Sequence, residues 1–241
     1  MTSSRRASVR KMNSPLLAEA PPPLLEHHPL GASTGYMTAL RGDWPALVEE
    51  ATRLSSFAAE LAALEESELP VLLDFLASGP SLPFRYLSVH GPSKGRQMSE
   101  RDLVAHLASL PRSVDAIVLH PDQIEDAALY VMLGERLVIE NMDARKRRGT
   151  VADELEPLFD ALPSAGLCFD VAHTWSVDPT MGVGDELLDR FASRLRHVHV
   201  SSISSEFGHV PLSAEHEELF SPLLSRCRDV PWILEAEPRL H

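Results

Sequence analysis

The chain has little cysteine and a shortage of positive charge. Only two cysteines, Cys168 and Cys227, occur in 241 residues, and no CxxC pair is present. This scarcity excludes a disulfide framework or a cysteine-built zinc knuckle, and it fits a reducing, cytoplasmic environment. The 35 acidic residues outnumber the 22 lysines and arginines, so the formal net charge is -13. A broad basic surface for nucleic acid is therefore disfavoured, although a locally basic cleft can exist on an acidic protein.

The sequence also lacks a long apolar run. No stretch approaches the roughly 18 residues that a membrane-spanning helix needs. The basic stretch from Arg5 to Lys11 is not followed by the apolar core of a signal peptide. We therefore expect a soluble, cytoplasmic protein with no membrane partner. The length and the hydrophobic fraction of 44% fit one domain with a sizeable core.

The first 29 residues differ in composition from the rest of the chain. They include the segment SPLLAEAPPPLLEHHPL, in which three consecutive prolines forbid a continuous helix. We interpret residues 1–29 as an N-terminal arm and residues 30–241 as the folded domain. The adjacent His27 and His28 are interpreted as part of a solvated arm, in preference to a metal site.

From Leu30 onward, eight strand-like runs alternate with helix-like segments. The runs are LGASTGYM, FAAELAAL, FRYLSVH, DAIVLH, RLVIEN, GLCFDVAH, HVHVSS and PWILEAEP. The second run is the least certain strand, because its alanines and leucines suit a helix equally well. Helices are expected over residues 43–56, 67–78, 99–110, 122–134, 150–162 and 185–195, and from residue 213 with an interruption at Pro222.

This alternation predicts an α/β protein with a (β/α)8 TIM barrel. The apolar runs are continuous, as expected for parallel strands that are covered by helices. Only six residues follow Glu235, so a regular eighth outer helix is not expected. The first and eighth strands would then expose apolar surface, unless the N-terminal arm or a second copy in a homo-oligomer covers it. We expect the arm to pack across that gap.

Six acidic and histidine residues stand at or near the ends of these runs, at intervals of 30, 20, 30, 29 and 36 residues by subtraction of their numbers. Each interval is about the length of one strand-plus-helix unit. A barrel of parallel strands brings their C-terminal ends to one face, where the six side chains would converge. They are His90, His120, Glu140, Asp170, His199 and Glu235.

The residue types indicate a divalent-metal centre. Three carboxylates and one imidazole, from Glu140, Asp170, His199 and Glu235, suit Mn, Mg, Co, Fe or Zn at a site that stays open to substrate. A second ion could be held by His90 and His120, with Glu140 bridging the two ions. A lone strand-terminal histidine is more often a hydrogen-bonded residue than a ligand, but six such residues at successive strands favour metal binding.

Further residues are expected around the same mouth. His173 and His209 are candidates for substrate binding, and a direct ligand role stays open for both. Two basic loops, with Lys94 and Arg96 in one and Arg145 in the other, would form a positive rim for a phosphate or carboxylate. The alternative is that both loops are simply solvated. Trp175 could form an apolar wall of the pocket or pack on its neighbours.

As an ordered set, the runs LSVHGP, IVLHP, VIEN, LCFDVAH, VHVSS, GHVPL and ILE resemble the xylose isomerase-like barrel superfamily. That superfamily includes sugar and sugar-phosphate isomerases and epimerases, and the type-four apurinic endonucleases. The resemblance covers roughly residues 30–237. Similarity to the epimerase branch implies one divalent ion bound by Glu140, Asp170, His199 and Glu235. In that case Glu140 and Glu235 also move the proton. Similarity to the endonuclease branch implies a second zinc ion bound by His90, His120 and Glu140, and a third bound by His173 and His209.

The chain departs from both patterns at the loop after the seventh strand. Phe207 stands where the endonuclease pattern has an Asp two residues before the last histidine, which disfavours a third ion. Ser204 and Ser205 stand where the epimerase pattern has an arginine, which disfavours a free ketohexose as substrate.

Taken together, the sequence predicts a divalent-metal-dependent sugar or sugar-phosphate isomerase or epimerase, with one or two ions. The reaction would be proton abstraction next to a metal-chelated carbonyl of a small polyhydroxylated or phosphorylated substrate. Glu140 and Glu235 would be catalytic. The alternatives are a two-metal phosphoester hydrolase of the apurinic endonuclease type, and a non-catalytic barrel that binds a metabolite or a partner protein.

Overall fold

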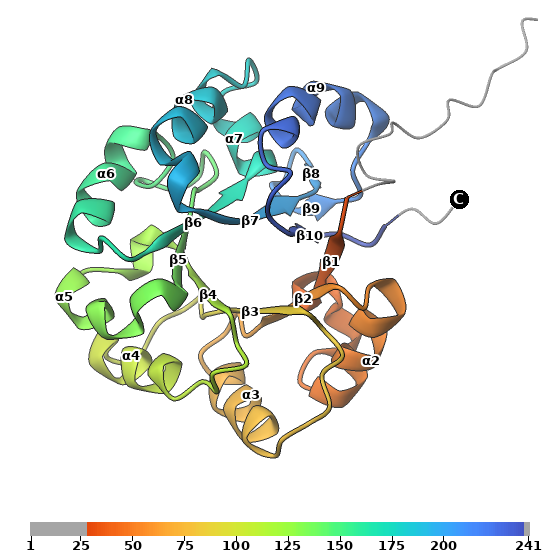
Figure 1. Cartoon of the computed structure of the whole chain (residues 1–241), viewed down its shortest axis with the longest axis vertical. Helices are drawn as coiled ribbons and strands as arrows, with labels where there is room; N and C mark the ends of the chain where they lie inside the picture. Colours follow the sequence, from red (N-terminus) through yellow and green to blue (C-terminus); the bar gives the residue numbers. More distant parts are fainter. Residues whose placement is uncertain (1–27, 239–241) are drawn as a thin grey trace, which may run out of the picture.

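The computed structural model describes residues 28–238 and contains a closed barrel of eight parallel strands. Figure 1 shows the strands around the centre and the helices outside them. The predicted (β/α)8 barrel is confirmed. Around the barrel the order is β1 (Leu30–Ser33), β10 (Trp232–Leu234), β7 (Leu195–Val200), β6 (Gly166–Asp170), β5 (Leu137–Glu140), β4 (Ala116–Leu119), β3 (Tyr86–His90) and β2 (Ala58–Ala62).

Five of the eight α-helices of residues 28–238 begin at a side-chain cap that the sequence supplies. Side chains of Asp43, Ser99 and Ser213 accept hydrogen bonds from backbone N–H groups in the first turns of their helices. None of the eight helices in this part of the chain is long and apolar enough to cross a membrane. They are α2 (Trp44–Leu54), α3 (Glu68–Ala77), α4 (Glu100–Ala108), α5 (Ala127–Tyr130), α6 (Ala152–Ala161), α7 (Val171–Val177), α8 (Gly182–Phe191) and α9 (Ala214–Ser225).

Several helix boundaries differ from the expectation, and α8 (Gly182–Phe191) begins and ends earlier than the expected range 185–195. Residues 122–134 do not form one helix, because Ile124 is extended and Asp126 caps a new start at α5; a 3-10 segment, η4 (Val131–Arg136), follows. The sixth strand ends at Asp170, whose side chain caps α7, so His173 lies on a helix. Helix α9 runs through Pro222, since buried Phe220 and Leu223 anchor it on both sides.

In the described residues no helix follows β10. Other residues cover the junction between β10 and β1. The His28 ring stacks on Trp232 with their centroids 3.8 Å apart, and His28 Nε2 donates to the Val230 carbonyl at 2.8 Å. Trp232 is thereby fully buried. The prediction that the arm crosses this gap concerns residues 1–29, of which all but His28 and Pro29 lie outside the described residues.

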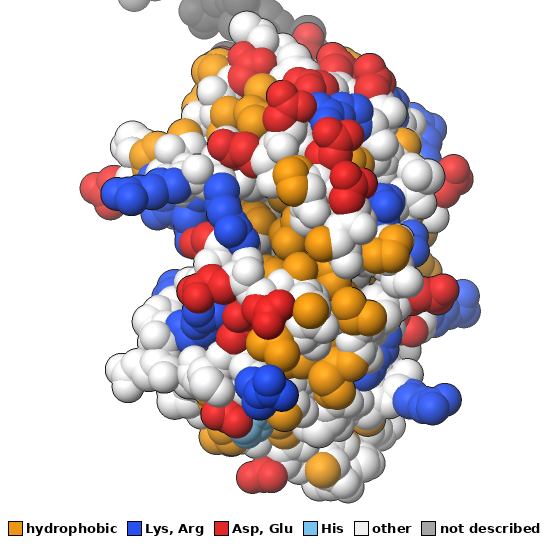
Figure 2. Space-filling view, turned by 90° about the vertical axis from the view of Figure 1, so that its left-hand side faces the viewer, with side chains coloured by type: hydrophobic (Ala, Val, Ile, Leu, Met, Phe, Trp, Pro, Cys, Tyr) orange, Lys and Arg blue, Asp and Glu red, His pale blue; other side chains and the backbone are white. Residues whose placement is uncertain are grey.

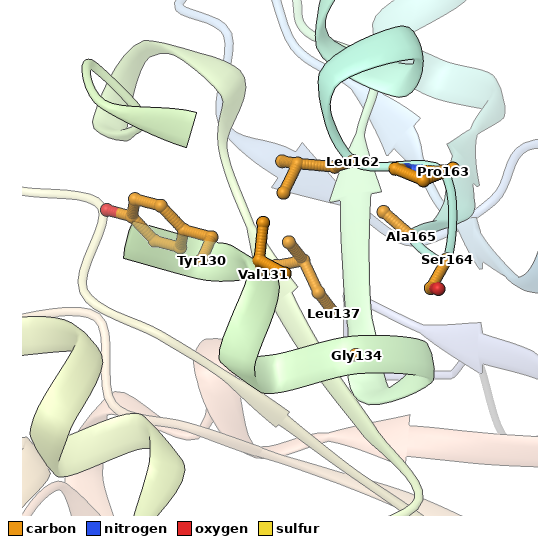
Figure 3. Close-up of a pocket in the computed structure, with 8 residues that line it drawn as sticks. All are labelled: Tyr130, Val131, Gly134, Leu137, Leu162, Pro163, Ser164 and Ala165. Atoms are coloured by element: carbon orange, nitrogen blue, oxygen red, sulfur yellow. The ribbon is translucent and has the colours of Figure 1, made fainter. Parts of the chain in front are cut away.

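The surface over α4 to α6 mixes charges with apolar side chains. Figure 2 shows acidic and basic groups around hydrophobic side chains in the middle of this face. Val131 and Met132 of η4 are 60% and 65% exposed there. Figure 3 shows a small pocket beside Val131, lined also by Leu137, Leu162 and their neighbours. Because Leu137 begins β5 and Glu140 ends it, this pocket lies at the end of β5 away from the predicted centre.

Gly149 lets the loop after β5 fold back on the loop after β4. It has a φ of 86°, and an added Cβ would lie 2.2 Å from Cγ of Pro121. Its carbonyl accepts a hydrogen bond from Met142 N at 2.8 Å, which closes the loop just after Glu140.

We expect Gly149→Ala to lower the free energy of unfolding by about 2 kcal/mol or more, because backbone strain and overlap with Pro121 add together. Urea unfolding measures this. Gly42→Ala is the matched control, since Gly42 has a φ of 89° with nothing within 4 Å of the added Cβ. A loss in Gly149→Ala no larger than in the control would show that the contact with Pro121 is unimportant.

Candidate metal centre

The barrel brings the six predicted side chains together at the C-terminal ends of its strands. His90, Glu140 and Asp170 are the last residues of β3, β5 and β6, and His199 lies near the end of β7. His120 and Glu235 directly follow β4 and β10. The first four are buried almost completely, whereas the side chains of His120 and Glu235 are each 13% exposed. The group therefore lies in the barrel mouth, open to solvent on one side.

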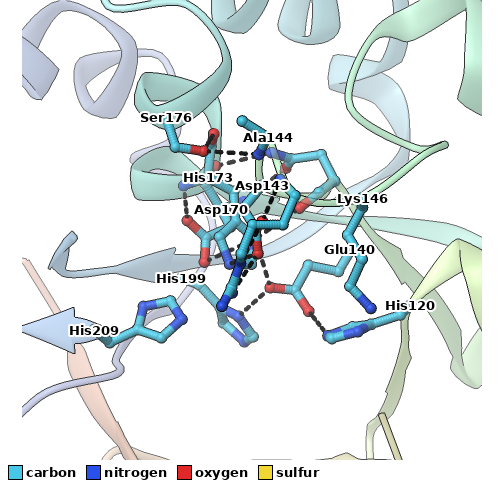
Figure 4. A network of polar contacts seen from close by, with 12 residues as sticks. His120, Glu140, Asp143, Ala144, Lys146, Asp170, His173, Ser176, His199 and His209 are labelled. Carbon is cyan, nitrogen blue, oxygen red and sulfur yellow. Dashed lines mark hydrogen bonds and ion pairs between the residues drawn. The ribbon is translucent and has the colours of Figure 1, made fainter. Parts of the chain in front are cut away.

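Glu140 is at the centre of this group. One oxygen, Oε2, is 3.1 Å from His90 Nε2 and 3.2 Å from His120 Nε2. The other, Oε1, is 3.2 Å from His199 Nδ1. Figure 4 shows Glu140 between His120 and His199. Burial opposes ionisation of Glu140, but the charge of His199 and the histidine hydrogen bonds hold its pKa well below the ordinary value. The two carboxylate oxygens thus face two different sets of donors.

The first set contains Glu140, Asp170, His199 and Glu235, whose nearest N and O atoms lie within 4.8 Å of one another. His199 Nδ1 is also 3.3 Å from Glu235 Oε1. Oδ2 of Asp170 and Oε2 of Glu235 are buried without a hydrogen-bond partner. Burial, followed by the charges of Asp170 and Glu140, raises the pKa of Glu235 well above its ordinary value despite His199. Unpaired buried carboxylate oxygens at such spacing fit a bound cation.

Three smaller sets adjoin the first, and one of them, formed by Cys168, His197 and His199, is fully buried in the barrel interior. His90, His120 and Glu140 bring three donor atoms within 4.8 Å, and so do Asp170, His173 and His209. The set with His173 and His209 is present although Phe207 replaces the expected carboxylate. The nearest other carboxylate to His173 Nε2 is Asp143 Oδ2, at 3.9 Å. His173 Nδ1 donates to the Asn141 carbonyl at 2.9 Å, which leaves Nε2 as the free nitrogen of the ring.

The predicted basic rim is largely paired with acidic groups. Arg145 makes two hydrogen bonds to buried Asp143, at 2.9 and 2.8 Å, and lies over the ring of Phe207. Arg96 pairs with Glu125 at 2.6 Å and donates to a backbone carbonyl. Lys94 is exposed on the loop after β3. Arg145 is linked to the metal-type groups through Asp143, whose Oδ2 lies 3.9 Å from His173 Nε2.

Two aromatic residues pack against each other from different helices. Trp175 lies on α7 and packs on a neighbour, with its ring 4.5 Å from the ring of His216. His216 is half-buried, stacks on Phe220 and contacts Ser202 Oγ at 2.8 Å. A helix periodicity alone could not show that α7 packs against this face of α9.

Glu60 is a site residue that sequence reasoning missed. It lies in β2, is fully buried, and accepts hydrogen bonds from Ser33 Oγ at 3.3 Å and Ser88 Oγ at 2.9 Å. Its Oε2 is 3.2 Å from His199 Nε2. Burial opposes its ionisation, but the charge and hydrogen bond of His199 lower the pKa of Glu60 to about 2. The available signal was a single charged residue in the otherwise apolar run FAAELAAL.

The proton state of the centre predicts how metal affinity varies with pH. Burial lowers the pKa of His90 and His199, but neighbouring carboxylates raise both above the ordinary value. Glu235 also has a raised pKa, whereas burial lowers the pKa of His120. An ion must therefore displace protons from His90, His199 and Glu235, so its affinity must rise with pH.

We expect the affinity for Mn²⁺ to increase at least about tenfold between about pH 6 and about pH 8. Isothermal titration calorimetry in buffers of different ionisation enthalpy measures the affinity and the protons released. A pH-independent affinity with no proton release would contradict this assignment.

A closed parallel barrel with clustered carboxylates and imidazoles at its C-terminal mouth is a (β/α)8 barrel whose candidate site lies at the face where such barrels carry their active sites. The family model described as "Xylose isomerase-like TIM barrel" matches residues 124–239, which confirms the resemblance drawn from the motifs. No curated protein matches the sequence.

Two solved structures with the same fold come from different kinds of protein. The AP endonuclease, family 2, from Brucella melitensis is 14% identical with a TM-score of 0.51, over 88% of this chain and 93% of that one. A putative sugar phosphate isomerase/epimerase from Anabaena variabilis is also 14% identical with a TM-score of 0.53, over 87% and 84%. At these identities the likeness shows the shared barrel and leaves the reaction to be argued from the site.

Proposed function

We propose that the protein is a divalent-metal-dependent isomerase or epimerase of a small polyhydroxylated or phosphorylated substrate. The observation that carries the proposal is the placement of two glutamates around one imidazole. Glu140 from β5 and Glu235 beside β10 approach His199 Nδ1 to 3.2 and 3.3 Å. Two carboxylates at one mouth, from strands separated by β6 and β7, are what removal and return of a proton require.

The residues present fit a divalent ion. Glu140, Asp170, His199 and Glu235 would hold it, and the buried unpaired oxygens of Asp170 and Glu235 would gain a partner. The mixed oxygen and nitrogen donors suit Mn, Zn, Co, Fe or Mg. His90 and His120, together with Glu140, would hold a second ion. When bound, such an ion polarises a substrate carbonyl and acidifies the neighbouring C–H bond.

The protein side chains would divide the proton chemistry between them. Glu140 would accept the proton from carbon, and Glu235 would return it on the other side or at the neighbouring carbon. The nearly complete burial of Glu140 limits the access of water during this transfer. His173 and His209, with ring centroids 5.3 Å apart at the same mouth, would contact substrate hydroxyls. Arg145, with a half-exposed side chain, would face a phosphate or carboxylate.

The proposal is tested by proton exchange at carbon. The Mn²⁺-loaded protein in deuterated water should introduce deuterium next to the carbonyl in at least one member of a panel of ketoses, aldoses and their phosphates. Glu235→Gln should slow this exchange by about 100-fold or more. A panel that takes up no deuterium with metal-loaded protein would reject the isomerase proposal.

A second candidate function is a metal-dependent phosphoester hydrolase. It is favoured by the additional sets around His90 and His120 and around His173 and His209, because adjacent ions are typical of phosphoester cleavage. The replacement of the expected Asp by Phe207 disfavours the third ion that the hydrolase function would use. Hydrolysis of an aryl phosphodiester, with two or three ions per chain by elemental analysis and no deuterium uptake, would favour it. Protein that binds no ion would favour a non-catalytic barrel.

A further inference from the structure

His199 spans two groups of carboxylates inside the barrel. Its Nδ1 faces the mouth, 3.2 Å from Glu140 Oε1 and 3.3 Å from Glu235 Oε1. Its Nε2 faces the interior, 3.2 Å from Glu60 Oε2. Glu60, Glu140 and His199 are fully or almost fully buried, and the side chain of Glu235 is 13% exposed. The imidazole therefore connects the predicted metal centre to a carboxylate that could not itself be part of that set.

Glu60 is fixed in place by the strands on either side of it. Ser33 on β1 and Ser88 on β3 donate to its two oxygens, and both strands pair with β2. Taking a carboxylate out of water is expensive, and an apolar residue of similar size would pack in a barrel interior without that cost. The two serine hydrogen bonds orient the carboxylate toward β7, where His199 lies.

The hydrogen-bonding pattern determines which nitrogen of His199 can bind a metal. An ionised carboxylate only accepts hydrogen bonds, so the proton between Glu60 and His199 must lie on Nε2. Nδ1 points at Glu140 and Glu235, so once an ion displaces the proton that Nδ1 shares with these carboxylates, the lone pair of Nδ1 faces the ion. This is the arrangement in which a carboxylate orients a metal-binding histidine and makes its free nitrogen more basic.

Other interior groups do not compete for Glu60. His197 Nε2 is 3.7 Å from Glu60 Oε2 and makes no hydrogen bond, while His197 Nδ1 contacts Tyr86 Oη at 2.7 Å. Burial raises the pKa of the Cys168 thiol well above its ordinary value, so this neighbour is a neutral group. His199 is thus the one histidine among the described residues within hydrogen-bond distance of Glu60.

We propose that Glu60 is the positioning residue of the metal centre, which holds His199 in the Nε2–H tautomer and directs Nδ1 to the ion. The inference rests on the proposed function only in requiring that the centre binds a divalent ion. It concerns a strand, β2, that contributes no ligand to any of the metal-type sets found within residues 28–238.

The experiment measures binding of Zn²⁺ alone, without substrate. Glu60→Gln should weaken Zn²⁺ binding about 10-fold, because the charge is lost, and Glu60→Ala about 100-fold, because the hydrogen bond is lost as well. Tyr86→Phe is the matched control. It removes a polar group from the same interior without touching Glu60 or His199, so its dissociation constant should stay within about twofold of the parent chain. Circular dichroism checks that each variant is folded.

A second measurement does not depend on any variant. In the Zn²⁺-loaded parent chain labelled with ¹⁵N-histidine, long-range ¹H–¹⁵N correlation spectra should show His199 with its proton on Nε2 and its metal on Nδ1. The opposite tautomer, or equal affinities in the parent chain and both Glu60 variants, would overturn the inference. So would a thiolate band in the Co²⁺ spectrum, because it would place an ion beside Cys168.

These outcomes are separable from the proposed function. A parent chain that binds Zn²⁺, shows the predicted tautomer and loses affinity in Glu60→Ala supports the inference even if no sugar takes up deuterium. A chain that exchanges deuterium but has unchanged Zn²⁺ affinity in both Glu60 variants rejects the inference alone. A parent chain that binds no divalent ion rejects both.

Discussion

Glu140→Gln is expected to abolish activity and to remove most of the bound metal. Glu140 contributes one oxygen to the set with His199 and the other to the set with His90 and His120. A neutral amide is a poor ligand and cannot accept a proton from carbon, so both functions are lost together. We expect the rate to fall by about 10⁴-fold or more, since loss of a general base alone costs 10² to 10⁴. Steady-state kinetics and elemental analysis of the purified variant measure the two effects.

The matched control is Glu186→Gln, which makes the same change of net charge on an exposed turn of α8, where Glu186 pairs with Arg190. Its rate and metal content should stay within about twofold of the parent chain, because a surface ion pair contributes little. An unchanged rate in Glu140→Gln would show that the centre has been assigned to the wrong residues.

The strand ends could be predicted because strands that recur at a regular spacing along the chain form a parallel barrel. In such a barrel the C-terminal ends of the strands lie close together. The runs ending in His90, Glu140 and Asp170 became β3, β5 and β6, and each of these residues ends its strand. The weakest predicted strand, FAAELAAL, became β2, since its pairing with β1 and β3 decided what its composition left ambiguous. Spacing could predict that side chains meet, but it could not say which nitrogen of His199 faces which carboxylate.

Features that depend on contacts between loops were not predictable from the sequence. The four basic residues after β5 indicated a positive rim, but Arg145 turns back onto Asp143 two residues earlier. The segment from Asp122 to Gly134 has helical composition, yet the extended backbone at Ile124 and the cap at Asp126 divide it. In both places a local hydrogen bond to an aspartate overrides the pattern of residue types.

Asp170→Asn is the second change for which we expect a large effect, and it separates the structural role of Asp170 from its role toward the ion. Oδ1 of Asp170 caps α7 by accepting from His173 N at 2.7 Å, while Oδ2 has no hydrogen-bond partner. Asparagine caps a helix as well as aspartate does, so α7 should be retained. The charge facing the ion is lost, and we expect Mn²⁺ affinity to fall by about 100-fold or more, because loss of an outer partner of a metal ligand already costs about 10- to 100-fold.

In the metal-free protein, we expect Asp170→Asn to cause no loss of stability. The charge of Asp170 is one of the causes that raise the pKa of Glu235, so removing it relieves a repulsion, and Asp170→Asn should be at least as stable as the parent chain in urea without metal. Asp170→Ala is the control, since it removes the cap as well and should cost about 1 kcal/mol more than Asp170→Asn. If Asp170→Asn instead unfolds at lower urea concentration and binds Mn²⁺ normally, then Asp170 serves the helix and not the ion, and the first donor set loses one of its three carboxylates.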